Sequence, residues 1–222
     1  METGQPETKA VWKKIDLAAI LIIGELVAWL VFAIFQNARN DLFFYPNLIN
    51  FFGSALNIGL FMALSVPLAA LACLYIAYLL GQKIPIIFQV AKFISVGILN
   101  TLIDWGILTV QVILTGINVG FGYSIFKSIS FMVAVFNSFV WNKYWTFKKN
   151  DTGKTQQELL RFLLLSLVGF CINVGVASFV VNVIGPQGGI SPNLWATVGG
   201  ASATMFSMVW DFAVYKFIVF KK

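Results

Sequence analysis

Six polar side chains interrupt two apolar stretches between residues 91 and 145. Charged and amide groups are costly in apolar surroundings unless they bind a partner. Carboxylates and amides bind hydroxyl groups because they accept and donate hydrogen bonds at close range. A lysine ammonium binds a phosphate as a point charge. These residues are therefore candidates for binding a ligand that carries hydroxyl or phosphate groups. They are Asn100, Asp104, Lys127, Asn137, Asn142 and Lys143.

Asp104 and Lys127 are the charged residues deep within these stretches. An ionisable side chain at the centre of a membrane span costs about 2.5–3.5 kcal/mol on insertion scales, so each requires a partner or a function. Asp104 lies about 18 Å along a helix from Lys92, at 1.5 Å per residue. Two interpretations stay open for the pair: an ion pair that holds two helices together, or a polar site on the path of a polar headgroup.

The composition indicates that the helices carrying these residues lie in a membrane. The chain has 222 residues, of which 59% are hydrophobic and 11% charged, and its mean hydropathy is +0.85. A soluble domain of this length could not cover so much apolar surface. The net charge of +6 comes from basic residues beside apolar stretches. That position orients a membrane protein and argues against a nucleic-acid partner.

Little in the sequence points to catalysis. Histidine is absent, and there is no zinc or disulfide spacing and no phosphate-cradling Gly-Lys-Ser loop. We expect a protein that is not an enzyme and that has no cofactor and no metal. Cys73 and Cys171 lie in apolar stretches and are expected to be small core residues.

Hydropathy predicts an all-α membrane protein with six spans. A polar tail at 1–14 precedes an additional two-helix hairpin at 15–82, and a four-helix domain occupies 83–222, with hairpins at 91–145 and 159–219. The aromatic segment 37–54 is expected at the membrane interface. Asp16, Lys143 and Lys216 lie near span ends, where they can reach the interface. The predicted spans are 15–36, 55–80, 91–114, 123–145, 159–184 and 194–219.

The distribution of basic residues predicts the orientation. Thirteen of the 15 Lys and Arg residues fall at one set of span ends. This bias places both termini in the cytoplasm and makes the chain a multi-pass protein of the cytoplasmic membrane.

An internal repeat connects the last four spans. FVWNKYWTFKK at 139–149 aligns without a gap with FAVYKFIVFKK at 212–222, and Asn100 corresponds to Asn173 at the same offset. Both hairpins enter and leave on the same side, so the repeat is parallel. The two asparagines could serve helix packing or headgroup contact. Lys143 and Lys216 could be interfacial anchors or could capture a phosphate.

The segments KFISVGILNTLIDWG at 92–106 and FNSFVWNKYWTFKK at 136–149 resemble the GtrA-like family of small membrane proteins. The resemblance covers about 90 to 222 and leaves the first two spans as an addition to the four that are usual in the family. It implies a role in cell-surface polysaccharide synthesis. Family members are proposed to flip polyprenyl-phosphate-linked monosaccharides or to assist a membrane glycosyltransferase.

Three functions follow as hypotheses. The first is translocation of a polyprenyl-phosphate-sugar lipid, with the six polar residues named above as the substrate-binding set. The second is a non-transporting scaffold that anchors a glycosyltransferase, and the third is a small proton-coupled cation exporter. Membrane lipids are expected partners in each case, and a bundle with so few helices favours a homodimer.

Overall fold

The computed structural model describes residues 9–37, 45–117, 120–148, 155–185, 187–188, 202 and 205–220, and these are almost entirely helical. Helices α1 to α5 are followed by a π-helical turn, η1, and helix α6 continues directly into a second π-helical turn, η2. Residues 205–214 are helical and run into a third, η3. The bounds are α1 Lys14–Asn37, α2 Tyr45–Phe52, α3 Ala55–Gly81, α4 Pro85–Thr115, α5 Gly120–Trp141, η1 Asn142–Thr146, α6 Thr155–Ser178, η2 Phe179–Ile184 and η3 Tyr215–Val219.

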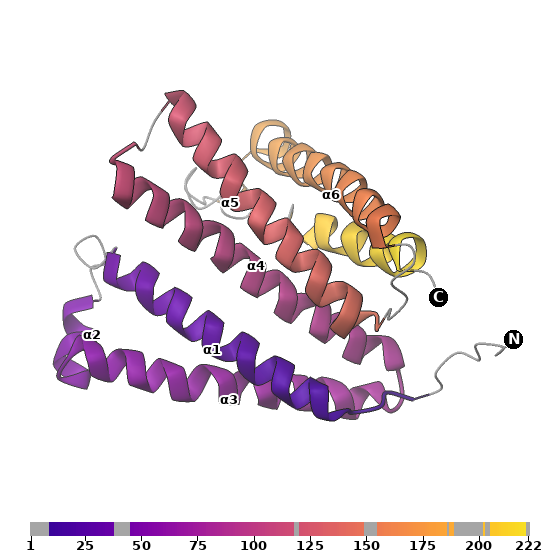
Figure 1. Ribbon diagram of the computed structural model, residues 1–222, viewed down its shortest axis with the longest axis horizontal. Helices are drawn as coiled ribbons and strands as arrows, with labels where there is room; N and C mark the ends of the chain where they lie inside the picture. The colour runs from indigo at the N-terminus through magenta and orange to yellow at the C-terminus, as the bar shows by residue number, and fades with distance from the viewer. Residues whose placement is uncertain are drawn as a thin grey trace, which may run out of the picture. The chain divides into compact units, whose positions relative to one another are not determined.

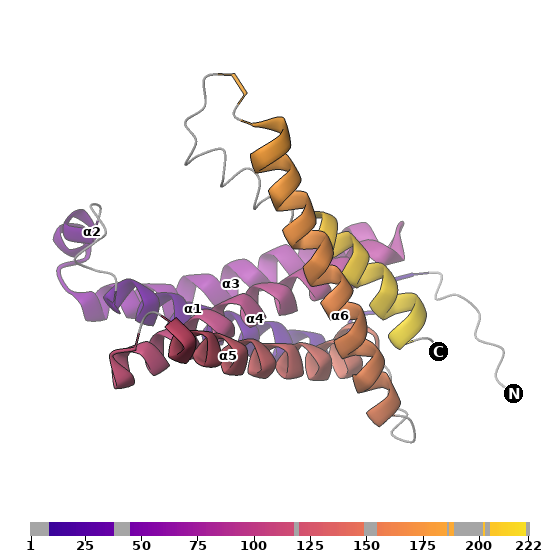
Figure 2. The ribbon, with the colours of Figure 1, turned by 90° about the horizontal axis from the view of Figure 1, so that it is seen from above.

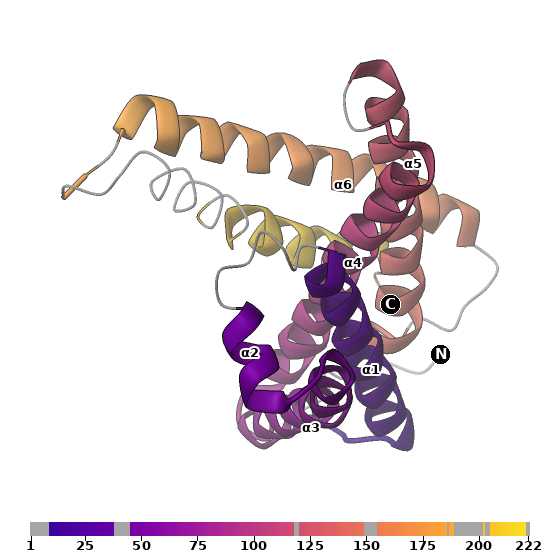
Figure 3. The same cartoon turned by 90° about the vertical axis from the view of Figure 1, so that its left-hand side faces the viewer.

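The chain forms two compact units, Met1–Lys148 and Lys149–Lys222, and each is described by itself. In the first unit, α1, α3, α4 and α5 run side by side along one direction (Figure 1). Helix α4 packs against α1, α3 and α5, so it is the central helix of the unit. The short helix α2 lies next to the first turns of α3 (Figure 3).

Three of the six predicted spans coincide with helices that are long and apolar enough to cross a membrane. They are Lys14–Gln36, Ala55–Gly81 and Pro85–Thr115. Large apolar side chains on these helices point outward; Leu64 is 70% exposed and Ile113 is 60% exposed. A surface of this kind suits lipid rather than water. The protein is therefore a membrane protein, and the other three spans stay predictions, the last of them partly outside the described residues.

Several helix boundaries differ from the prediction. Helix α4 begins at Pro85 rather than at 91. Proline is favoured at the first helical position, because a backbone N–H at that position has no partner within the helix and its loss costs no hydrogen bond. Helix α6 begins at Thr155 rather than at 159. The segment 37–54 contains the helix α2, on which Phe51 is 83% exposed.

Close approach of α1 and α3 depends on a glycine and a proline. A Cβ atom placed on Gly24 would lie 2.5 Å from the Cα of Pro67, so the backbones of the two helices touch. Pro67 lies inside α3 and is buried. Proline removes one backbone hydrogen bond, a loss that membrane helices tolerate where a neighbouring helix packs against the kink.

The second unit consists of α6 with η2, and the C-terminal helix with η3. In Figure 2 the C-terminal helix runs alongside α6. The rings of Phe162 and Tyr215 stack with centroids 4.3 Å apart, and Trp210 Nε1 donates to the carbonyl oxygen of Leu165 at 3.3 Å. The expectation that the two cysteines are core residues is wrong, because Cys73 on α3 and Cys171 on α6 are both exposed.

Candidate functional site

Two hydrogen bonds between side chains join α4 to α5 within the first hairpin. Asn137 Nδ2 donates to Asn100 Oδ1 at 2.6 Å, and Ser130 Oγ donates to Asp104 Oδ1 at 2.6 Å. The two acceptors lie one turn apart on α4. We call these four residues the polar seam; they bring together three of the six predicted binding residues.

The polar seam leaves a donor unused. Asn100 Nδ2 is buried and has no hydrogen-bond partner among the described residues. An unpaired amide in an apolar environment is costly, and it can be satisfied by an acceptor such as a hydroxyl oxygen of a ligand. Lys127 lies on α5, but its side chain is outside the described residues, so its predicted pairing with Asp104 stays a prediction.

The second hairpin has a similar bond at the corresponding position. Asn173 Nδ2 donates to Ser207 Oγ at 3.1 Å, so both asparagines of the repeat bond to the opposite helix of their own hairpin. Interhelical bonds of this type support helix packing in membranes. Asn100 and Asn173 thus make interhelical bonds of the kind that the packing interpretation predicts, and contact with a headgroup stays a prediction.

Asn142 and Lys143 lie in the π-helical turn η1, which widens the end of α5. The N–H of Phe147 bonds to the carbonyl oxygen of Asn142 at 2.9 Å, and Asn142 Nδ2 donates to Ser138 Oγ on the same helix at 3.2 Å. Asn142 is 1% exposed and Lys143 is 0% exposed. The expectation that Lys143 reaches the interface is wrong, because its side chain is completely buried.

The end of the second hairpin has the same local geometry. In η3 the N–H of Phe220 bonds to the carbonyl oxygen of Tyr215 at 2.8 Å. Lys216 Nζ lies 5.6 Å from the ring centroid of Phe212, as Lys143 Nζ lies 5.9 Å from that of Phe139. The two aligned sequence endings therefore share a π-helical turn and a lysine–phenylalanine contact.

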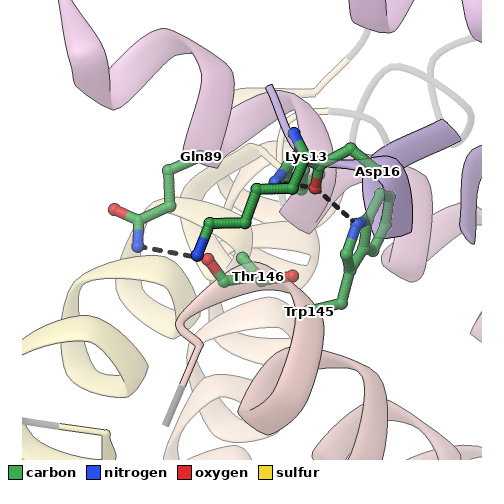
Figure 4. A network of polar contacts seen from close by, with 6 residues as sticks. Lys13, Asp16, Gln89, Trp145 and Thr146 are labelled. Atoms are coloured by element: carbon green, nitrogen blue, oxygen red, sulfur yellow. Dashed lines mark hydrogen bonds and ion pairs between the residues drawn. The ribbon is translucent and has the colours of Figure 1, made fainter. Parts of the chain in front are cut away.

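Sequence reasoning missed a buried ionic cluster in the first unit, built around Asp16 (Figure 4). Asp16 Oδ1 accepts from Lys92 Nζ and from Trp145 Nε1, the latter at 3.0 Å. Asp16 Oδ2 accepts from the backbone N–H of Lys13 at 2.8 Å. Asp16, Lys92 and Trp145 are almost completely buried. The expectation that Asp16 lies at the interface is wrong, because its carboxylate is held by three donors inside the protein.

Three segments position this cluster. Asp16 is in the first turn of α1, Lys92 is two turns into α4, and Trp145 is in η1. The ammonium of Lys92 also lies 4.2 Å from the ring centroid of Phe88, a contact that stabilises a desolvated cation. Gln89 Nε2 donates to the carbonyl oxygen of Thr146 at 3.4 Å, which ties α4 to η1 a second time.

The remaining acids within the spans differ in their surroundings. Glu25 on α1 is exposed. Asp211 in the second unit lies against Gly169, and its Oδ1 is buried with no hydrogen-bond partner among the described residues. No group of His, Cys, Asp and Glu side chains in the described part of the chain could hold a metal ion.

Comparison with known proteins identifies relatives of the hairpin region. The family described as the GtrA/DPMS transmembrane domain matches residues 92–220. An uncharacterized membrane protein of Bacillus subtilis (strain 168), YngA, is 32% identical over an alignment of 127 residues that covers 54% of this chain and 77% of YngA. No solved structure matches. Lys92 and Trp145 lie inside the matched region, and Asp16 lies outside it.

Proposed function

The chain belongs to the family of GtrA/DPMS transmembrane domains, and from this premise we propose that it translocates a polyprenyl-phosphate-linked monosaccharide across the cytoplasmic membrane. The family suggests a role in the machinery of polysaccharide synthesis. The cargo would be consumed on the outer side, in glycosylation of a cell-surface polysaccharide. The proposal involves no catalytic step.

The observation that carries this proposal is the polar seam between two apolar helices. Asn100 and Asp104 face Asn137 and Ser130 across the hairpin, and buried Asn100 keeps an unused donor. A sugar headgroup offers hydroxyl oxygens that both donate and accept, so it can replace the bonds between the two helices one for one. The prenyl chain would stay in lipid, against the exposed apolar side chains of α4.

Lys143 has a defined role in this proposal. Its ammonium is buried in η1, on the same hairpin as the polar seam and at its end. Contact between this ammonium and a lipid phosphate requires the end of the hairpin to open, so the arrangement described corresponds to a closed state. Rocking of hairpins against each other is the established way for repeat-built carriers to alternate between sides.

Reconstitution of the purified chain in liposomes tests the proposal. The liposomes contain a radiolabelled polyprenyl-phosphate hexose, and its movement between leaflets is followed by accessibility to an added periodate solution. We expect movement by the natural chain and at least about tenfold slower movement by Asn100→Leu, which corresponds to about 1.4 kcal/mol of lost binding. Thr101→Ala is the matched control, because the hydrogen bond that Thr101 makes within the described residues is to its own helix, at the carbonyl oxygen of Gly97.

Three outcomes would count against the proposal. Absence of lipid movement by the purified chain, together with stable co-purification of a glycosyltransferase, would favour the scaffold. A proton-coupled cation flux that Asp104→Asn abolishes would favour the exporter. Equal rates for Asn100→Leu and the natural chain would remove the polar seam from the transport path.

A further inference from the structure

The donors that hold Asp16 form a site of unusual chemistry. A lysine ammonium, an indole N–H and a backbone N–H all point at one carboxylate, and none of the three groups can accept a hydrogen bond. Such a set selects for an anion with at least two oxygen atoms. A phosphate ester presents oxygen atoms of the same kind, and it forms charge-assisted bonds with the same donors.

The donors and the anion have different origins. Lys92 and Trp145 lie in the part of the chain that matches the family, and they are brought together by α4 and η1, which pack against each other. Asp16 comes from α1, outside that part. The matched segment is a larger share of YngA than of this chain, so YngA is the shorter protein. The side-chain donors therefore belong to the hairpin itself, and the carboxylate is supplied by an added helix.

An apolar groove lies beside this site. It has a volume of about 420 Å³ and is lined by Trp12, Leu17, Leu68, Leu71, Ala72 and Tyr75. The ring of Trp12 stacks on that of Phe88 with centroids 5.8 Å apart, and Phe88 contacts the Lys92 ammonium. A chain of two aromatic rings thus connects an apolar groove to a cation. A ligand that fits both has a hydrocarbon chain and an anionic head.

We propose that Lys92 and Trp145 form a binding site for the phosphate of a membrane lipid, and that Asp16 occupies this site as an internal substitute for the phosphate. The lipid chain lies in the groove that Trp12 and Leu17 line. The lipid phosphate and the Asp16 carboxylate exclude each other, because two anions at the same donors would repel each other. Binding of the lipid displaces the Asp16 side chain from the Lys92 ammonium and the Trp145 indole, while Trp12 and Leu17 keep lining the groove. This inference concerns the side of α4 that faces α1, and it holds whether or not the chain transports a lipid.

Direct binding measurements on the purified full chain in detergent test this proposal. The probes are short-chain phosphatidic acid, the corresponding diacylglycerol without phosphate, and inorganic phosphate. Asp16→Asn removes the charge that competes with a phosphate for Lys92, and we expect it to bind phosphatidic acid at least about tenfold more tightly than the natural chain, because a larger fraction of molecules is competent to bind. Asp16→Asn combined with Lys92→Met should lose this gain, and diacylglycerol should not distinguish the variants.

A second pair of variants keeps the test decisive if Asp16→Asn does not fold. Leu17→Trp fills the groove and leaves the ionic cluster intact, so we expect about tenfold weaker binding of phosphatidic acid. Leu26→Trp is the matched control, since Leu26 is 44% exposed on the same helix and Leu17 is 42% exposed. Equal binding by these two variants would overturn the groove assignment.

Other outcomes separate the sources of phosphate. If Asp16→Asn binds phosphatidic acid no better than the natural chain, Asp16 is a structural ion-pair partner and the proposal is wrong. If inorganic phosphate binds Asp16→Asn as tightly as phosphatidic acid does, the site takes free phosphate and the lipid assignment is wrong. If the purified natural chain moves no polyprenyl-phosphate hexose, but Asp16→Asn still binds phosphatidic acid more tightly than the natural chain, the proposed function is overturned and this site remains.

Discussion

Removal of one partner of the Asp16–Lys92 ion pair should destabilise the first unit far more than removal of both. The side chains are 0% and 2% exposed, respectively. A charge left without its partner in such a place costs about 3–5 kcal/mol, whereas replacing the whole pair with neutral groups of similar size is often close to neutral. We expect Asp16→Asn and Lys92→Met each to lower the free energy of unfolding by about 3–5 kcal/mol.

The double variant decides the prediction. Asp16→Asn/Lys92→Met leaves no unpaired charge, and the asparagine oxygen can still accept from Trp145 Nε1. Its loss of stability should be smaller than that of either single variant, which gives a coupling energy of about 3 kcal/mol or more. Unfolding by SDS in mixed micelles measures the four free energies, with tryptophan fluorescence as the signal. Lys83→Met is the control, because Lys83 is exposed and should change stability by less than about 0.5 kcal/mol.

The result that would refute this reasoning is additivity. If the double variant loses as much stability as the two single variants together, the carboxylate and the ammonium do not act as a pair. Burial of the two groups would then be stabilised independently, by the indole and the backbone N–H for Asp16 and by the ring of Phe88 for Lys92.

Two further predictions concern helix packing. Gly24→Ala should lower the unfolding free energy by about 1–3 kcal/mol, because the new Cβ meets the backbone of Pro67; Gly97→Ala, with nothing within 4 Å, should not, and equal effects in thermal unfolding would contradict the proposed close approach. Asn100→Leu and Asn137→Leu should be non-additive in SDS unfolding, with a coupling of about 0.6 kcal/mol and at most about 1.7 kcal/mol; a coupling of zero would mean that the bond between the two amides does not form in the membrane.

The sequence predicted the elements better than the contacts between them. Hydropathy located α1, α3 and α4 with ends that differ from the prediction by at most six residues, since a span must be long and apolar whatever it packs against. Packing through an interhelical bond was one of two interpretations for Asn100 and Asn173, but the sequence did not show that Asn137 is the partner of Asn100. The shared offset of the two endings pointed to duplication, but their π-helical turns could not be inferred, because a widened turn leaves no mark in hydropathy.

The Asp16 cluster was missed for a different reason. Asp16 and Trp145 are 129 residues apart, and no local pattern relates an acid at the start of one span to an indole at the end of another. One indication was available: Asp16 is an acid within a region whose other charges, Lys13, Lys14 and Lys92, are basic and fall at the same predicted side of the membrane. An acid in that setting is expected to form an ion pair with one of these lysines, but the sequence does not show which lysine is the partner.

The distance along the chain between the members of this cluster has a consequence for biosynthesis. The ribosome makes Lys92 76 residues after Asp16, and it makes Trp145 129 residues after Asp16. At about 5–20 residues per second, a ribosome needs roughly 6–26 s to make the intervening chain. For about the first 4–15 s of that time, before Lys92 is made, the Asp16 carboxylate has only the Lys13 backbone N–H as a partner from this cluster.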